Sequence, residues 1–298
     1  MKNEIRSAAI LFLTAAIWGF AMSAQRAGSQ YLSPMTFNAA RFFFGALVLL
    51  PLMFRENRKN DSPIRKNEAV KGVILGVVLF IAQLLQQMSV GEAGAGKSGF
   101  LTALYVVLVP VLGVFVRKKT RITTWLALLL ALPALYLLCV PGGERFSLEG
   151  PDVLLLIGAF FWAAHILATD HFVRFVAPLK LCAVQFAAGA ALNWLCALLF
   201  ETITGENLLR ALVPALYCGI LSTGVGYLLQ TVGQRGCRPA FAALILSLES
   251  VFCIISGALL LGERMDGRGY LGCALMLLAV LLAQGGGLLK TRDGGTRA

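Results

Sequence analysis

Apolar residues are gathered into long runs along this chain, and short polar or charged stretches separate the runs. An α-helix needs about 20 predominantly apolar residues to cross a hydrocarbon core of about 30 Å. Runs of this kind lie at residues 7–27, 36–54, 71–90, 98–116, 122–140, 152–171, 179–200, 210–231, 239–261 and 268–288. The pattern therefore predicts an all-α polytopic membrane protein with ten transmembrane helices.

The overall composition agrees with this interpretation. Hydrophobic residues make up 58% of the 298 residues and charged residues only 14%, which is more apolar than a soluble domain requires. A cleaved signal peptide is not expected in the first run, because Trp18 and Gly19 interrupt it and no small-x-small cleavage site follows. We expect a multi-pass protein of the plasma (cytoplasmic) membrane, with the lipid bilayer around it.

Basic residues are distributed unevenly between the two sides of the predicted membrane. If the N-terminus is cytoplasmic, 19 of the 26 Lys and Arg residues fall in inner segments and 6 in outer ones, and Arg41 lies within a span. This asymmetry follows the positive-inside rule and predicts that both termini are cytoplasmic. The net charge of +11 then reflects orientation, so a nucleic-acid partner is not expected.

The two halves of the chain resemble each other in the order of their residues. Matching residues lie 144 positions apart: Trp18 and Trp162, Pro34 and Pro178, Phe42 and Phe186, Gly45 and Gly189, and the segments 83–87 and 227–231. Residues 99–115 match 239–255 at an offset of 140. We predict two five-helix repeats, at 1–141 and 142–298. Because five is odd, the second repeat must be inverted, which is typical of secondary transporters.

The segment GEAGAGKS, Gly91 to Ser98, matches the Walker A pattern G-x-x-x-x-G-K-[ST]. A phosphate-binding loop of that kind follows a β-strand and opens a helix, whereas this segment follows the apolar run 71–90. The charge distribution also places it on the outer side, away from cytosolic ATP. We interpret it as a glycine-rich turn between two helices, and we expect no nucleotide partner.

Several short motifs resemble the EamA family of the drug/metabolite transporter superfamily. They are Trp18-Gly19, Pro34 with Arg41-Phe42 and Gly45-Ala46, the segment Lys97–Pro110, Ser247-Leu248-Glu249, and Leu261-Gly262-Glu263-Arg264. The resemblance implies a ten-helix exporter of amino acids or related metabolites that works by alternating access around a central cavity, without an ATPase. The family often has Glu-Pro where this chain has Glu249-Ser250, so the motif gives no reason to expect a kink in the ninth helix.

Two charged residues lie well inside predicted spans, Arg41 in the second and Glu249 in the ninth. Charges inside a bilayer are costly and usually face a cavity or a partner. We expect Arg41 to be a structural anchor that binds backbone carbonyls or Glu249; the alternative is that it holds a substrate carboxylate. Glu249 is interpreted either as a proton carrier or as a structural partner of Arg41 or of a helix end.

Polar and aromatic residues recur at matching places in the two halves. Gln83, Gln86 and Gln87 share one face of the third helix, and their equivalents in the eighth include Tyr227 and Gln230. We predict that both faces line a substrate cavity; interhelical hydrogen bonding is the alternative.

Four further side chains are candidates for the predicted cavity, and together they imply a small amphipathic ligand; for the two tryptophans, ordinary packing is the alternative. They are Trp18, Tyr105, Trp162 and His165. An imidazole with an ordinary pKa of about 6.5 could couple binding to protons near neutral pH, so His165 is the candidate for that role.

Signatures of enzymes and metal sites are missing from the sequence. There is no nucleophile elbow, H-E-x-x-H or acidic D-x-x-D cluster, and the seven cysteines form no C-x-x-C pair. We therefore expect no enzymatic activity, no metal and no cofactor. The expected function is secondary-active export of a small-molecule substrate, with an intramembrane hydrolase or a channel as alternatives. The oligomeric state is left open, a monomer being one possibility.

Overall fold

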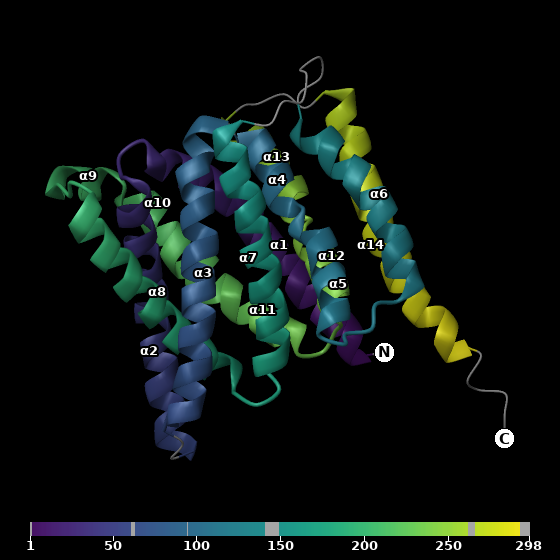
Figure 1. The fold of residues 1–298 in the computed structure, drawn as a ribbon, viewed down its shortest axis with the longest axis horizontal. Helices are drawn as coiled ribbons and strands as arrows, with labels where there is room; N and C mark the ends of the chain where they lie inside the picture. The colour runs from purple at the N-terminus through teal and green to yellow at the C-terminus, as the bar shows by residue number, and fades with distance from the viewer. Residues whose placement is uncertain (1, 61–62, 94, 141–148, 262–265, 293–298) are drawn as a thin grey trace.

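A bundle of long helices makes up the structure, a computed structural model that describes residues 2–60, 63–93, 95–140, 149–261 and 266–292 (Figure 1). Within these residues there are ten helical segments long and apolar enough to cross a membrane, and no β-strand. The ten predicted transmembrane helices are therefore confirmed. The predicted boundary between the repeats, at residues 141 and 142, lies outside the described residues.

Each half of the chain contributes five transmembrane segments, some of which consist of more than one element. The first half contains α1 (Lys2–Ser29), α2 (Pro34–Asn60), α3 (Lys66–Ala93), α4 (Ala95–Ala103), α5 (Tyr105–Phe115) and α6 (Ile122–Cys139). The second half contains α7 (Gly150–Phe172), α8 (Pro178–Phe200), α9 (Gly205–Arg210), α10 (Leu212–Leu216), the π-helix η1 (Tyr217–Gly226), α11 (Tyr227–Gln234), α12 (Pro239–Leu246), α13 (Glu249–Leu261) and α14 (Gly267–Arg292). The end of the bundle where α1 begins and α14 ends is called the N-terminal end below.

The Walker-type segment Gly91–Ser98 is made up of the end of α3 and the start of α4. Residue 94 and the side chains of residues 91–97 are outside the described part of the chain. Residues 91–93 are the last of α3 and residues 95–98 are the first of α4, so the described part of the predicted glycine-rich turn is helical. The element that precedes the segment is thus a helix, whereas a phosphate-binding loop follows a strand.

Two of the transmembrane segments that the sequence predicts as continuous helices are broken near the middle of the bundle. The fourth is divided at Leu104 into α4 and α5, and the ninth is divided at Ser247 and Leu248 into α12 and α13. In the ninth, the Ser247 hydroxyl donates to the carbonyl of Leu244 at 2.8 Å, and the Leu248 N–H bonds to the carbonyl of Ile245, three residues back. A serine that bonds to its own helix bends it, so the break forms here without a proline.

The eighth transmembrane segment departs from α-helical spacing over ten residues, the π-helix η1. At its end the Tyr227 N–H donates to Thr223 O, four residues back, and the carbonyl of Ser222 instead accepts the Trp18 Nε1–H at 3.1 Å. A change from five-residue to four-residue spacing leaves one carbonyl without a partner in its own helix. Here the indole of α1 satisfies that carbonyl, which joins α1 to η1.

The two repeats meet along lines of equivalent residues. α2 packs against α8, its counterpart, and the Phe42 and Phe186 ring centroids are 6.3 Å apart. Trp18 and Trp162, also equivalent, have ring centroids 6.4 Å apart. Contacts between equivalent residues are expected where the twofold axis of an inverted repeat passes. This axis runs through the middle of the bundle.

Glycine allows the closest approach of α1 to α13. A Cβ atom added at Gly19 would lie 2.7 Å from the backbone oxygen of Glu249 and 2.3 Å from Cβ of Phe252. Small residues permit such close helix packing in membranes. The first helix is therefore held directly against the break in the ninth segment.

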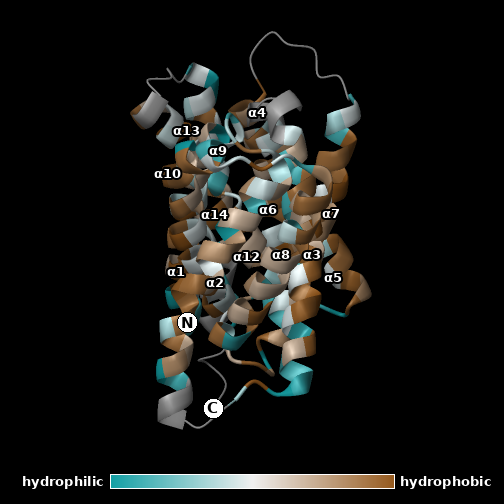
Figure 2. Ribbon diagram, turned by 90° about the vertical axis from the view of Figure 1, so that its left-hand side faces the viewer, coloured by the Kyte–Doolittle hydropathy of each residue, from teal (hydrophilic) through white to brown (hydrophobic). Residues whose placement is uncertain are grey.

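Hydrophobic residues predominate along the middle of the bundle, and hydrophilic residues lie mainly toward the two ends of its helices (Figure 2). Phe115, Leu198 and Val213 are 81%, 71% and 76% exposed. Exposed apolar side chains of this size suit contact with lipid tails. α6 and α14, the last transmembrane helix of each half, pack against each other at one side of the bundle (Figure 1).

Candidate functional site

A cavity lies between the two halves, close to the axis that relates them. Its free volume is about 30 Å³, room for about two water molecules. Nine of the eleven residues singled out from the sequence line it; the exceptions are Gln87 and His165. Five more lining residues come from the structure alone: Met22, Gln25, Thr102, Ile166 and Ser222.

Arg41 is 1% exposed and is held by four neutral oxygens. Its Nη1 donates to the amide oxygens of Gln25 at 3.0 Å and Gln83 at 2.9 Å, while Nη2 and Nε donate to the hydroxyls of Ser222 at 3.1 Å and Thr223 at 3.2 Å. These acceptors belong to α1, α3 and η1. Arg41 thus ties three helices together through side chains, whereas the sequence led us to expect backbone carbonyls or Glu249 as its partners.

Gln83 connects the arginine to Tyr227. The Gln83 Nε2 donates to the Tyr227 hydroxyl at 2.6 Å. The two side chains are 3% and 1% exposed, so the contact is buried. The polar faces predicted for the third and eighth helices therefore touch directly through their equivalent residues.

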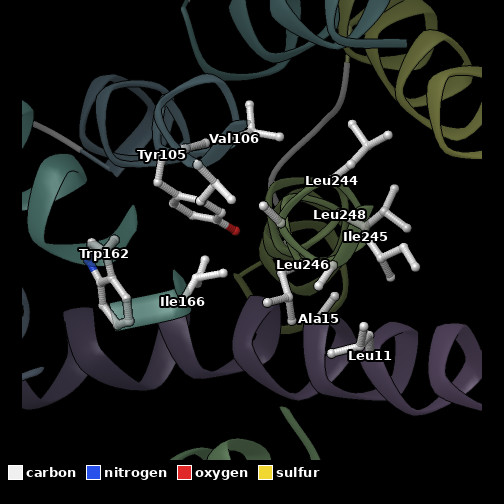
Figure 3. Packing of buried hydrophobic residues seen from close by; sticks show 14 of the residues in the cluster. Leu11, Ala15, Tyr105, Val106, Trp162, Ile166, Leu244, Ile245, Leu246 and Leu248 are labelled. Carbon is white, nitrogen blue, oxygen red and sulfur yellow. The ribbon is translucent and has the colours of Figure 1, made fainter. Parts of the chain in front are cut away.

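Aromatic rings surround Tyr227. The ring of Trp18 lies 4.8 Å from it, and that of Trp162 lies 6.3 Å away and nearly parallel, with an interplanar angle of 8°. Tyr105 extends from α5 toward Ile166 on α7 (Figure 3). Rings at these separations are in favourable contact, and their faces offer apolar surface to a ligand.

Some polar atoms of the lining have no protein partner among the described residues. They are both amide atoms of Gln230, the Tyr105 hydroxyl, the Thr102 hydroxyl and the indole N–H of Trp162, all buried. Buried polar groups normally have a hydrogen-bond partner, and each exception calls for an explanation. Water or a polar ligand in the cavity could supply the missing partners.

Glu249 brings the second charge to the cavity. It is the first residue of α13, directly after the break in the ninth segment. In the described part of the chain, no ion pair joins it to Arg41 or to another basic residue. The cavity thus holds a guanidinium and a carboxyl group that no ion pair joins in the described part of the chain.

Gln87 and His165 lie close to the cavity without lining it. The Gln87 amide is buried and has no partner among the described residues. The His165 ring lies 6.0 Å from Tyr227 and 6.4 Å from Trp162, and its Nε2 is 3.1 Å from Oε1 of Gln185. His165 therefore contacts the aromatic residues Trp162 and Tyr227 but does not itself line the cavity.

The bundle is closed at its N-terminal end. On α1, the cavity-lining residues Trp18, Met22 and Gln25 all lie in the half of the helix farther from that end. Between the cavity and the N-terminal end, Leu11 and Ala15 of α1 pack near the leucines of α12 (Figure 3).

Polar contacts add to this closure. Gln234 Nε2 donates to the carbonyl of Ile166 at 3.1 Å. Lys118, which follows α5, pairs with Asp170 of α7, a carboxylate only 2% exposed that also meets Arg174. Ion pairs and packed side chains together separate the cavity from this end.

Some residues of the site were not predicted, and they differ in whether the sequence could have identified them. Gln25 lies seven residues after Trp18 and three after Met22, so a search of the same helical face would have found it. Ser222 and Thr223 belong to the π-helix η1, where α-helical spacing does not predict the direction in which a side chain points.

Metal binding requires a group of side chains that can act as ligands. Among the described residues, no group of three His, Cys, Asp or Glu side chains could hold a metal ion.

Comparison with known proteins gives consistent matches along the chain. The model of the EamA-like transporter family matches residues 6–140 and again 150–284. An uncharacterized transporter of Archaeoglobus fulgidus is 30% identical over 276 residues, which cover 91% of this chain and 83% of the relative. The uncharacterized transporter YwfM of Bacillus subtilis is 28% identical over 291 residues, 95% of this chain and 94% of the relative.

A solved structure shares the fold. It is described only as the crystal structure of a protein, and it superposes with a TM-score of 0.78 at 18% identity. The match covers 94% of this chain and 98% of the other. At this identity the likeness concerns the fold alone.

Proposed function

Because the chain belongs to the EamA-like transporter family, we propose that it is a secondary-active transporter that exports small amphipathic metabolites, such as amino acids, across the plasma membrane. One observation carries the proposal: a cavity between the two repeats that combines aromatic faces, amides, one arginine and one glutamate. Sites of this kind near the midplane bind the cargo of secondary transporters. Aromatic faces suit an apolar body, and the charges suit a polar end.

The size and position of the cavity support a mechanism of alternating access. About 30 Å³ holds water but no amino acid, so cargo binding requires the helices to move apart. With both termini cytoplasmic, the closed N-terminal end faces the cytoplasm in this conformation. Inverted repeats can exchange conformations, which would open this end.

The breaks in the fourth and ninth segments are suited to this movement. Tyr105 and Glu249 directly follow the two breaks, and both line the cavity. A helix that is interrupted beside its ligand can tilt one part without moving the other. We infer that α5 and α13 move relative to α4 and α12 when the cavity opens.

Transport by purified protein in liposomes tests the proposal. A thermal-shift screen against amino acids, nucleobases and amines first selects a cargo, since a ligand stabilises the folded state by mass action. We expect saturable flux of that cargo, accelerated by unlabelled cargo on the opposite side. Flux that neither saturates nor responds to cargo on the opposite side would indicate a channel, and chemical conversion of the cargo would indicate a hydrolase. Liposomes without protein are the control.

A further inference from the structure

The hydrogen bonds of Arg41 determine how the amide of Gln83 is oriented. A guanidinium can only donate, so the Gln83 atom 2.9 Å from Arg41 Nη1 must be the oxygen. The other end of the same amide is then the NH₂ group, which lies 2.6 Å from the Tyr227 hydroxyl. An amide nitrogen cannot accept, so Gln83 donates and the Tyr227 oxygen accepts.

The orientation of the Gln83 amide determines where the hydroxyl proton of Tyr227 can point. Its hydroxyl oxygen already accepts from Gln83, and Gln83 offers no lone pair in return. No hydrogen bond from the Tyr227 O–H to another described residue is present, and Tyr227 lines the cavity. The tyrosine therefore presents a donor to whatever occupies the cavity.

Arg41 presents a second donor and a positive charge. Of its five N–H groups, four are used by Gln25, Gln83, Ser222 and Thr223, which leaves one on Nη2. All four acceptors are neutral, and within the described ranges no carboxylate lies within 4.0 Å of the guanidinium. A buried cation that no carboxylate pairs with favours an anionic ligand.

We propose that Arg41 and Tyr227 bind a carboxylate group of the cargo, with Gln83 as the positioning residue that keeps both donors directed at it. This rests on the proposed function and specifies the chemistry of one end of its site. A carboxylate has two oxygens, enough to accept from Arg41 Nη2 and from the Tyr227 hydroxyl together. The aromatic faces of Trp18 and Trp162 then flank the remainder of the cargo.

The experiment compares amino acids with their primary amides, which differ only in the charged group. Binding to the purified protein is measured by calorimetry for L-phenylalanine, L-leucine and L-glutamine and for the amide of each. We expect at least one acid to bind, and to bind about tenfold or more tightly than its amide, because an anion accepts stronger hydrogen bonds from charged and hydroxyl donors than a neutral amide does. The phosphonate analogue of phenylalanine shows whether another anion can replace the carboxylate.

Two variants test the donor arrangement. In Gln83→Glu the new carboxylate still accepts from Arg41 Nη1 and also accepts the Tyr227 proton. The tyrosine donor is thereby withdrawn from the cavity and the charge of Arg41 is neutralised, without loss of the Arg41 contact. We expect the preference for acid over amide to fall below about threefold. Tyr227→Phe removes one donor while keeping the ring, and it should lower affinity for the acid more than for the amide. Gln30→Glu introduces the same charge at an exposed position and is the control.

The outcomes separate this inference from the proposed function. Equal binding of acids and amides, binding of neither, or an unchanged preference in Gln83→Glu would overturn the carboxylate site. Tighter binding of the phosphonate would replace the carboxylate by a phosphoryl anion and would also overturn it as stated. Saturable transport of a cargo that has no carboxylate would refute the inference but leave the proposed transport function in place.

Discussion

Gln83 and Tyr227 are equivalent residues of the two repeats, 144 positions apart, and they are joined by a 2.6 Å hydrogen bond. Trp18 and Trp162 meet in the same way, with ring centroids 6.4 Å apart. The axis that relates the repeats therefore passes through the cavity wall. Equivalent positions nonetheless carry different chemistry, amide against phenol, so the two sides of the cavity are alike in backbone and different in hydrogen bonding.

The equivalent of Arg41 in the second repeat is Gln185, which pairs with His165. The positive charge of the cavity is therefore present on one side only. When inverted repeats exchange conformations, a symmetric site would offer the same groups to both sides of the membrane. Because Arg41 has Gln185 as its equivalent, this site offers different groups to the two sides of the membrane. We expect this difference to affect the side on which the cargo is released more readily.

The orientation of the protein in the membrane can be tested with single cysteines. In a cysteine-free background, we expect Glu206→Cys to react with an impermeant thiol reagent applied outside intact cells. Lys119→Cys should react only after permeabilisation. Both positions are exposed at opposite ends of the bundle, and the asymmetry of basic residues places position 119 in the cytoplasm. The reverse labelling pattern would refute the cytoplasmic location of the termini.

Replacement of Arg41 by alanine is expected to destabilise the protein by about 3 kcal/mol or more. The change strands four buried oxygens from three helices, each of which loses a donor. Melting of the purified protein in detergent measures the effect. Arg55→Ala, at an exposed position of the same helix, should melt like the unchanged protein. An Arg41→Ala protein of unchanged stability would show that the four contacts contribute little to the fold.

Gln230 should behave in the opposite way. Its amide has no partner among the described residues, so Gln230→Leu leaves nothing unpaired and is expected to be neutral or stabilising in the melting experiment. Because Gln230 lines the cavity, the same change should weaken the apparent affinity for a verified cargo. Asn38→Leu removes another buried amide without a described partner, away from the cavity, and is the control. If the unchanged protein, Gln230→Leu and Asn38→Leu all transported the cargo with the same apparent affinity, Gln230 would not belong to the binding site.

The contact between Lys118 and Asp170 is expected to hold the N-terminal end closed. Asp170→Asn removes a carboxylate that is 2% exposed and leaves Lys118 without its partner, which should cost about 3 kcal/mol in the stability of this conformation. Glu206→Gln breaks the exposed pair with Arg210 and should cost less than about 1 kcal/mol. The two melting temperatures check the difference. A cysteine introduced near Ile166 should also become more reactive from this end in Asp170→Asn; an unchanged rate would argue against a role in closure.

The sequence by itself determined the ten helices, the inverted repeat and most residues of the cavity. The thickness of the bilayer sets how many consecutive apolar residues a spanning helix needs, so the spans can be recognised from local composition alone. The offset of 144 identified Trp18, Trp162, Gln83 and Tyr227 as equivalents, since each repeat must build the same backbone around the axis. Charged and amide side chains within apolar spans are costly, so their presence alone marked Arg41 and Gln83 as cavity or packing residues.

Only the tertiary structure decided which of these groups meet. Nearly every position of a buried transmembrane helix is apolar, so periodicity does not reveal which face points inward, and Gln87 was not separable from Gln83 and Gln86. The π-helix η1 changes the direction of Ser222 and Thr223, and the break at Ser247 arises from a side-chain hydrogen bond that no proline announces. Arg41 has four neutral partners from distant parts of the chain because helix packing, a long-range property, brings their oxygens within reach of one guanidinium.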